Sequence, residues 1–224
     1  MNKYEDLLGS WYSKLAPFLK SEEFKNILRT LKEESSQTEI FPKPEKIFNC
    51  FKYCPFDKTM VVFLGANPYY NFSKSDGLLF SHEGPGTNKL LKLVFNAIED
   101  NYDKKLKNTD SNLERWANQG VLLLSLDLTF CYGKRGSHIK LWGPFLRAVI
   151  SALHEHHPGV IYVLFGQDSL KYADLIDPTS NDIFCVEHPA KSLILGRNWK
   201  HKNVFLYLDR VTNMIFNRKI NWYA

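Results

Sequence analysis

Four short apolar runs stand out along the chain, and each is bounded by polar or turn-forming residues. They are Met60–Leu64, Val121–Leu126, Val160–Phe165 and Ile183–Val186. Continuous runs of this length, in which polar and apolar positions do not alternate, predict strands that are buried on both faces.

Apolar residues at helical spacing occupy the segments between those runs. Asn88–Asp100 and Trp142–His156 show this spacing, and the first forty residues show it among many charges. Strands that alternate with helices predict an α/β fold with three layers, α/β/α, around a central, mainly parallel four-stranded sheet. No repeat or linker divides the chain, so we expect a single domain, 1–224, with an N-terminal helical segment, 1–40.

The composition is typical of a globular protein and adds little about partners. Apolar residues make up 44% of the 224 residues, charged residues 24%, and the formal net charge is +5. This small excess permits a polyanion partner without requiring one. The apolar runs are far too short to span a bilayer, and the amino terminus lacks the layout of a signal peptide. We therefore expect a soluble, cytoplasmic monomer without membrane contact.

The four cysteines are too few for a disulfide framework in a chain of this length. They are Cys50, Cys54, Cys131 and Cys185. Four thiols could ligate an iron–sulfur cluster, but only the first two are close in sequence. Buried or half-buried free thiols are the favoured interpretation, and we expect no metal and no cofactor.

Polar residues lie at the end of each predicted strand or just beyond it, where parallel sheets bind their ligands. In chain order they include Asn67, Ser125, Asp127, Gln167 and His188. Each has an ordinary alternative, such as an Asn-Pro turn or a hydrogen-bonded structural histidine. A basic loop follows His188, which favours contact with a phosphate chain.

Several segments together resemble the uracil-DNA glycosylase superfamily, most closely its first-described family. In chain order they are Cys54–Lys58, Val61–Gly65, Gly77–Ser81, Trp116–Leu124, Ser137–His138, Val163–Gly166, His188–Pro189 and Ile220–Trp222. The match runs in unbroken order over about residues 40 to 222. It implies a pocket for a base flipped out of DNA and hydrolysis of the N-glycosidic bond of that base.

The resemblance also assigns roles to individual residues. His188 would donate a hydrogen bond to the departing base, and Tyr69 would exclude bulky 5-substituents. Phe80 would stack on the base, although an aromatic ring at this position could equally be part of the core. Contacts to the DNA are expected from Ser81, Thr87, Asn88, Gln167, Lys191, Ser192, Leu193 and Arg197. Leu193 or Ile194 would be the apolar wedge that enters the vacated stack, or would instead anchor the loop to the core.

The water-activating loop departs from the family pattern Gly-Gln-Asp-Pro-Tyr-His. Ala66 replaces the glutamine, Asn67 the aspartate and Tyr70 the histidine. A neutral amide can orient water but cannot stabilise an oxocarbenium ion by charge, and such a loss costs on the order of 10²–10³ in rate. Asp127 and Asp76 are candidate substitutes for the lost charge, although either could be an ordinary solvated carboxylate.

The base-binding positions differ as well. Ser125 replaces the pyrimidine-reading asparagine, and both Ser125 and Ala66 are smaller than the family's residues, so the pocket should be wider and less selective. The predicted catalytic residues are Asn67, His188 and Asp127, and the predicted base-binding residues are Ala66, Tyr69, Phe80 and Ser125. We expect a modified pyrimidine, such as a phage-type modified cytosine, rather than plain uracil, which would make the protein a defence factor.

A protein of another class is the alternative. A catalytically weak or inactive glycosylase-like module could bind DNA or serve as a replication partner, and the missing carboxylate favours this. The retained His188 and Phe80 favour the enzyme. A nucleotide-binding domain unrelated to DNA is disfavoured because the chain lacks a glycine-rich phosphate loop of the usual kind.

Overall fold

The sheet at the centre of the molecule has four parallel strands in the order β3-β2-β5-β6. The computed structural model describes residues 3–67, 74–84 and 86–223. The strands are β2 (Val61–Gly65), β3 (Val121–Ser125), β5 (Ile161–Phe165) and β6 (Asp182–Val186), and a separate antiparallel pair joins β1 (Ile40–Phe41) to β4 (Phe130–Cys131). The parallel sheet predicted from the apolar runs is confirmed, and each predicted boundary lies within one residue of the observed one.

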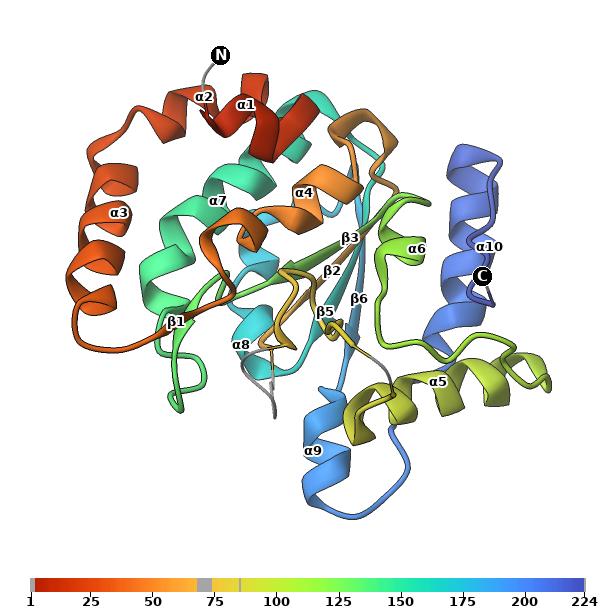
Figure 1. The fold of residues 1–224 in the computed structure, drawn as a ribbon. Coiled ribbons are helices and arrows are strands. Elements are labelled where there is room, and N and C mark those ends of the chain that lie inside the picture. Colours follow the sequence, from red (N-terminus) through yellow and green to blue (C-terminus); the bar gives the residue numbers. More distant parts are fainter. Residues whose placement is uncertain (1–2, 68–73, 85, 224) are drawn as a thin grey trace.

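Helices cover both faces of the sheet. In chain order they are α1 (Lys3–Leu8), α2 (Tyr12–Leu19), α3 (Glu22–Ser35), α4 (Asn49–Tyr53), α5 (Lys89–Tyr102), α6 (Glu114–Ala117), α7 (Ile139–His156), α8 (Gln167–Leu170), α9 (Pro189–Ile194) and α10 (Val204–Phe216). Figure 1 shows α4 and α7 on one side of the sheet and α5, α6 and α10 on the other. The predicted three-layer α/β/α architecture is therefore confirmed.

Two of the longer helices begin at short polar residues that suit an N-cap. Ser21 Oγ accepts a hydrogen bond from the Phe24 amide at the start of α3, and Asn88 Oδ1 accepts one from the Leu91 amide at the start of α5. Each cap satisfies an amide that has no partner within its own helix.

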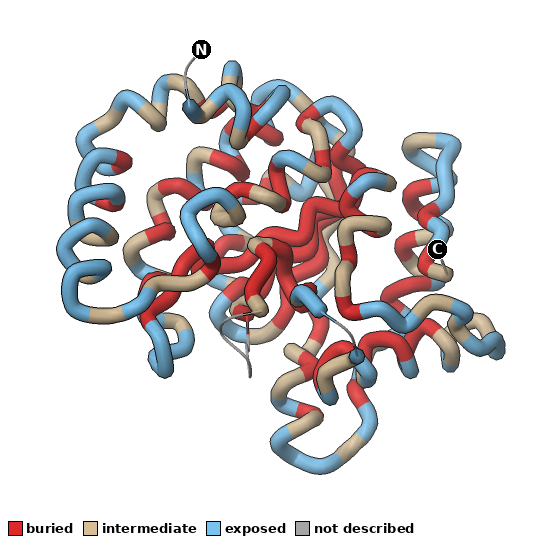
Figure 2. The backbone as a smooth tube through the Cα atoms, viewed as in Figure 1, coloured by how far each residue is buried: buried red, intermediate tan, exposed pale blue. Residues whose placement is uncertain are grey.

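The core follows the three inner strands. Every residue of β2, β3 and β5 is buried (Figure 2). On α7, the Phe145 ring lies 5.8 Å from the ring of Phe18 and 6.5 Å from that of Phe24, measured between centroids. Helices α2 and α3, within the predicted N-terminal helical segment, thus share a core with α7.

Strand β6 does not fit the prediction of burial on both faces. Only Val186 at its end is buried, and Cys185 is exposed. The strand lies at the sheet edge, where it pairs with β5 alone. Helix α10 covers part of it through Tyr207, whose ring lies 4.4 Å from that of Phe184.

All four thiols are free. Cys50, Cys54 and Cys131 are buried, as expected, whereas the exposed Cys185 contradicts the prediction. Among the described helices, none is long and apolar enough to cross a membrane.

Candidate active site

A cavity of about 320 Å³ opens where β2, β5 and β6 end. Ala66 and Asn67, which follow β2, line it together with Gln167 at the start of α8 and His188 after β6. Residues far apart in sequence meet here because parallel strands end at the same edge of the sheet. Asn67 and His188 therefore face one shared space.

His188 is held in one tautomer by backbone groups. The Ala190 amide donates to His188 Nδ1 at 3.1 Å, so the ring proton lies on Nε2, which donates to the Ala66 carbonyl at 2.8 Å. Burial lowers the pKa of His188, and this outweighs the opposing effects of that hydrogen bond and of Asp168. His188 is thus a neutral imidazole with an N–H donor at the cavity.

The ends of β5 and β6 can approach each other closely because residue 166 is a glycine. Gly166 has a φ of +79°, and a Cβ on it would lie 2.9 Å from the Cβ of His188. A larger residue would be strained by its backbone conformation and would displace the imidazole.

The side-chain amide of Asn67 is fixed by the segment that carries Phe80. Asn67 Oδ1 accepts from the Phe80 amide at 3.1 Å, and Asn67 Nδ2 donates to the Leu78 carbonyl at 3.4 Å. Phe80 has a φ of +67°, a conformation that is strained for a bulky residue. Its ring meets those of His188 and Phe165 edge to face, with centroids 5.5 and 5.0 Å apart. This arrangement places Phe80 directly beside the imidazole.

Asp127 lies immediately behind Asn67. Its Oδ1 accepts from the Asn67 amide at 3.2 Å and from Ser125 Oγ at 2.7 Å, whereas its Oδ2 has no hydrogen-bond partner among the described residues. Burial raises the pKa of Asp127 to about 6. The interpretation of Asp127 as a solvated carboxylate is therefore wrong. Neither Asp127 nor Ser125 is among the described residues that line the cavity.

Asp76 is also buried, but both of its oxygens have partners. Ser81 Oγ donates to Asp76 Oδ2 at 2.5 Å and the Leu78 amide donates to Oδ1 at 3.2 Å. Burial raises the pKa of Asp76 to about 6. Asp76 is thus not the solvated carboxylate considered from the sequence, and it braces the segment that presents Phe80. Ser81, expected to contact DNA, is fully buried in this conformation.

Three further residues expected to contact DNA are engaged within the protein. Asn88 caps α5, Thr87 Oγ1 donates to the Thr109 carbonyl, and the buried Ser192 donates to Glu187 Oε1. Of the residues assigned to the DNA surface, Gln167 and Lys191 are exposed.

Glu187 binds the basic residues of the loop around α9. Arg197 Nη2 donates to both Glu187 carboxylate oxygens at 2.8 Å, and the two residues are only partly exposed. Lys191 Nζ lies 3.7 Å from the same carboxylate, with 67% of its side chain exposed. Arg197 is therefore committed to Glu187, whereas Lys191 remains available to a second anion.

Exposed apolar residues follow at the end of α9. Leu193 is half-buried, whereas Ile194 is 80% exposed and Leu195 is 56% exposed. Of the two wedge candidates, the structure presents Ile194 to solvent, and Leu195 is an exposed neighbour that the sequence did not single out. In Figure 1 this segment projects away from the sheet.

The sequence analysis missed one wall of the cavity. Arg135, Gly136 and Ile139, from the loop before α7 and its first turn, line it along with Asp168. The only hint in the sequence was that the neighbouring Ser137–His138 resembles a superfamily segment, and this resemblance assigned no role to the loop. Tyr69, predicted to exclude bulky bases, and Tyr70 lie outside the described residues.

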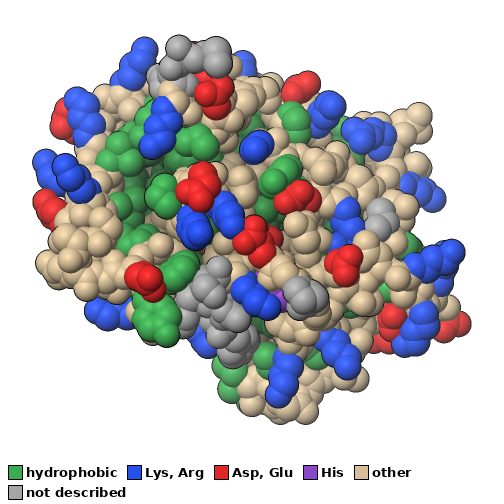
Figure 3. All heavy atoms as spheres, in the orientation of Figure 1, with side chains coloured by type: hydrophobic (Ala, Val, Ile, Leu, Met, Phe, Trp, Pro, Cys, Tyr) green, Lys and Arg blue, Asp and Glu red, His purple; other side chains and the backbone are tan. Residues whose placement is uncertain are grey.

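The surface charge is mixed. On the face shown in Figure 3, Lys and Arg side chains are interspersed with acidic ones and form no continuous basic stripe.

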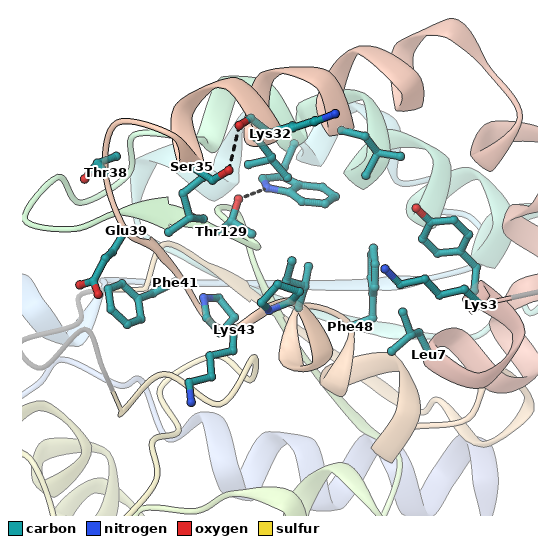
Figure 4. Close-up of a pocket in the computed structure, with 18 residues that line it drawn as sticks. Lys3, Leu7, Lys32, Ser35, Thr38, Glu39, Phe41, Lys43, Phe48 and Thr129 are labelled. Atoms are coloured by element: carbon teal, nitrogen blue, oxygen red, sulfur yellow. Dashed lines mark hydrogen bonds between the residues drawn. The ribbon is translucent and has the colours of Figure 1, made fainter.

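A second cavity, of about 620 Å³, lies between the N-terminal helices and β1, with Phe41, Phe48 and Leu7 among its apolar walls (Figure 4). It is separate from the cavity that contains His188.

The sequence profile of the family described as "Uracil DNA glycosylase superfamily" matches residues 51–208, most of the chain. The chain belongs to this superfamily. The family expected from the sequence motifs is confirmed, and with it the expected class of enzyme, a DNA glycosylase.

Relatives within the superfamily are similar over most of their length. A protein of Christiangramia forsetii named uracil-DNA glycosylase is 37% identical over 183 residues, 81% of this chain and 82% of the relative. A protein of Bacillus mycoides with the same name is 33% identical over 218 residues, 96% of each chain.

Solved structures agree with the fold. The crystal structure of mimivirus uracil-DNA glycosylase superposes with a TM-score of 0.75 at 23% identity, covering 82% of this chain and 70% of that one. The wild-type UNG structure from Nitratifractor salsuginis gives 0.56 at 16% identity, covering 89% and 95%.

Proposed function

We propose that this protein binds DNA, accepts a pyrimidine nucleotide flipped out of the helix, and hydrolyses its N-glycosidic bond with water to leave an abasic site. The observation that carries the proposal is the neutral His188, whose Nε2–H is fixed by the backbone at a cavity that Asn67 also lines. As the glycosidic bond breaks, the base takes up negative charge and the sugar becomes an oxocarbenium ion, so the site must stabilise both charges.

His188 serves the departing base. A neutral imidazole that donates from Nε2 can hydrogen-bond to a pyrimidine oxygen as that oxygen becomes anionic, in competition with the Ala66 carbonyl. The surrounding low dielectric strengthens this bond. Because burial keeps the pKa of His188 low, the ring remains neutral while it donates. Phe80, beside His188, is the proposed stacking partner of the base.

Asn67 and Asp127 serve the sugar and the water. The Asn67 side-chain amide, with its orientation set by Phe80 and Leu78, is the proposed water-orienting group. Asp127 supplies a negative charge through the hydrogen bond from the Asn67 amide, one layer behind the cavity. We therefore propose Asp127 as a positioning and electrostatic residue that partly replaces the missing loop carboxylate.

For the base, we propose a pyrimidine site with weak discrimination between uracil and modified pyrimidines. The names of the relatives support uracil. The Ser125 hydroxyl donates to Asp127, so it is a poor substitute for an amide that reads the edge of the base. A site that lacks such hydrogen bonds rejects analogues weakly. More narrowly, we propose that the site accepts modified pyrimidines, including a modified cytosine of phage DNA.

For the DNA, we propose contacts through the loop at α9. Ile194 would enter the space left by the flipped nucleotide, and Lys191 and Gln167 would approach phosphates. Leu193, half-buried at the same loop, would support Ile194 from behind.

The test uses matched duplexes that differ in one base: uracil, 5-hydroxymethyluracil, 5-hydroxymethylcytosine, thymine or cytosine. Released bases are identified by mass spectrometry, and abasic sites by strand cleavage in alkali, for wild type, Asn67→Ala and His188→Ala. We expect release of uracil and of at least one modified pyrimidine, and strong loss in both variants. Release of uracil alone would overturn the weak discrimination. DNA binding without any abasic product would instead indicate the binding module.

A further inference from the structure

Three side chains with metal-binding atoms converge outside the candidate active site. Glu34 lies near the end of α3, Cys131 in β4, and His138 directly before α7. The Cys131 Sγ lies 3.4 Å from His138 Nε2 and 3.5 Å from Glu34 Oε2, and the last two atoms are 2.5 Å apart. Cys131 and His138 are buried, and 41% of the Glu34 side chain is exposed.

The spacing of these atoms suits a tetrahedral ion. Zinc bonds of about 2.3 Å to sulfur and about 2.0 Å to nitrogen or oxygen place a thiolate about 3.5 Å from each other ligand. The two distances from Cys131 already match that value. Only the Glu34–His138 hydrogen bond would have to open, and the half-exposed Glu34 at the end of its helix has room to do so.

The histidine is oriented by a buried hydrogen-bond chain. His138 Nδ1 lies 2.8 Å from Thr129 Oγ1. Thr129 Oγ1 also accepts from Trp142 Nε1 at 2.7 Å, which is the dashed line at Thr129 in Figure 4. Nδ1 can donate to Thr129, which leaves the lone pair of Nε2 directed at Cys131 and Glu34. Histidine ligands of metals commonly have such a partner on the second ring nitrogen.

We propose that Cys131, His138 and Glu34 bind one zinc ion, with water in the fourth position. Thiolate, imidazole and carboxylate together suit Zn²⁺, whereas Mg²⁺ and Ca²⁺ prefer oxygen ligands alone. On binding, the Cys131 thiol gives its proton to solvent and the Glu34–His138 hydrogen bond is replaced by two metal–ligand bonds.

The location gives the site a consequence for the cavity. Cys131 and His138 stand at the two ends of loop 132–137, and the Cys131 amide donates to Ser137 Oγ across that loop at 3.0 Å. Arg135 and Gly136 of the same loop line the cavity that contains His188. A zinc ion would therefore fasten α3 to a wall of the candidate active site, whatever reaction takes place there.

The experiment uses tag-free full-length protein, treated with chelator and titrated with Co²⁺ as a spectroscopic substitute for Zn²⁺. We expect one Co²⁺ per chain, with a thiolate-to-cobalt charge-transfer band and tetrahedral visible bands that disappear when Zn²⁺ is added. Cys131→Ser should abolish the charge-transfer band. Cys185→Ser, which changes an exposed thiol of β6 outside the cluster, should leave it unchanged.

A second variant guards against a folding defect in Cys131→Ser. Glu34→Gln alters a half-exposed side chain, and we expect it to fold, to weaken Co²⁺ binding at least tenfold, and to lose most of the Zn²⁺-dependent rise in melting temperature. The proposal is overturned if wild type shows no thiolate band at stoichiometric Co²⁺, or if either variant binds Co²⁺ as wild type does. The three residues would then form only a hydrogen-bonded cluster.

Discussion

Two walls of the candidate active site, one with His188 and one with Asn67, are built in different ways. At the ends of β5 and β6, His188 is fixed by backbone groups alone, and its side chain carries no charge. At the ends of β2 and β3, Asn67 is held by side-chain and backbone bonds in front of a buried carboxylate, Asp127. The motif resemblance assigns His188 to the family's histidine, and it assigns Asn67, Ala66 and Ser125 to positions where the family has aspartate, glutamine and asparagine.

The two walls would stabilise different charges of the proposed reaction, which are the negative charge on the departing base and the positive charge on the sugar. In the reaction proposed above, the wall with His188 would face the departing base, and the wall with Asn67 would face the sugar and the water. A change in the second wall can slow the reaction or relax base selection without removing the group that stabilises the leaving base. The strongest test of this division therefore begins with His188.

Replacement of the imidazole should have the largest effect. His188→Ala removes the hydrogen bond to the departing base, and we expect single-turnover cleavage of the best substrate to fall on the order of 10²–10³. Binding of uncleaved duplex should change only a few-fold, since His188 acts mainly in the transition state. His156→Ala, on an exposed face of α7, is the matched control. Unchanged cleavage in His188→Ala would remove the basis for the enzymatic proposal.

Replacement of the buried carboxylate should have the next largest effect, and it should change the pH profile. The pKa of Asp127 is about 6, so the charge behind Asn67 is present above that pH and absent below it. We expect wild-type cleavage to rise between pH 5 and 7, and Asp127→Asn to be slower by about tenfold to a hundredfold at pH 7.5 with a flatter profile. The measurement is single-turnover rate against pH.

Asp76 provides the comparison for that experiment. Its pKa is also about 6, but it bonds to Ser81 and Leu78 rather than to Asn67. Asp76→Asn should keep the wild-type pH midpoint of cleavage. If it flattens the profile while Asp127→Asn does not, the electrostatic role assigned to Asp127 is wrong.

The same aspartates affect stability. Both pKa values are raised in the folded state, so the folded chain binds more protons than the unfolded chain between pH 4 and 6, and the free energy of unfolding falls as pH rises through that range. Asp127→Asn should remove one contribution to this fall. We expect its free energy of unfolding, relative to wild type, to be higher at pH 7.5 than at pH 4.5 by about 1–3 kcal/mol in denaturant titrations.

The sheet was predictable from sequence because its inner strands are buried on both faces, which produces continuous apolar runs such as Val160–Phe165. The edge strand β6 shows where this reasoning fails. The apolar run Ile183–Val186 looks like the runs of the inner strands, yet Cys185 is exposed. The run does not reveal that β6 lies at the edge of the sheet, because the position of a strand in the sheet is set only when the sheet assembles.

The site was predictable only in part, for a related reason. Order along the chain places Asn67 and His188 at one edge of the sheet, since parallel strands share that edge. It does not reveal that Asp127 is buried behind Asn67, that Glu187 holds Arg197, or that Glu34 meets His138 across 104 residues. Such contacts depend on three-dimensional packing rather than on local pattern.

Ile194, at the exposed end of α9, should affect how readily a nucleotide is flipped into the site, and so should affect both walls alike. Ile194→Ala removes an apolar side chain that is 80% exposed, and we expect cleavage in duplex DNA to slow by about tenfold while cleavage in single-stranded DNA changes little. Met214→Ala, which alters a 73% exposed apolar residue on α10, is the matched control. Equal losses on both kinds of DNA would assign Ile194 to folding of the loop instead.

The smallest effect should come from the charged residues of the same loop, and it separates two cations that look alike in sequence. Lys191 is exposed and only loosely associated with Glu187, so Lys191→Ala should weaken duplex binding a few-fold and reduce the slope of log affinity against log salt by about 1. Arg197 is bound to Glu187 through both oxygens, so Arg197→Ala should leave the slope near that of wild type. Any loss in that variant would come from a loosened loop, since Glu187 also accepts from Ser192. Binding measured at several salt concentrations decides between the two, and a change of slope in Arg197→Ala but not in Lys191→Ala would reverse the assignment of the phosphate contact.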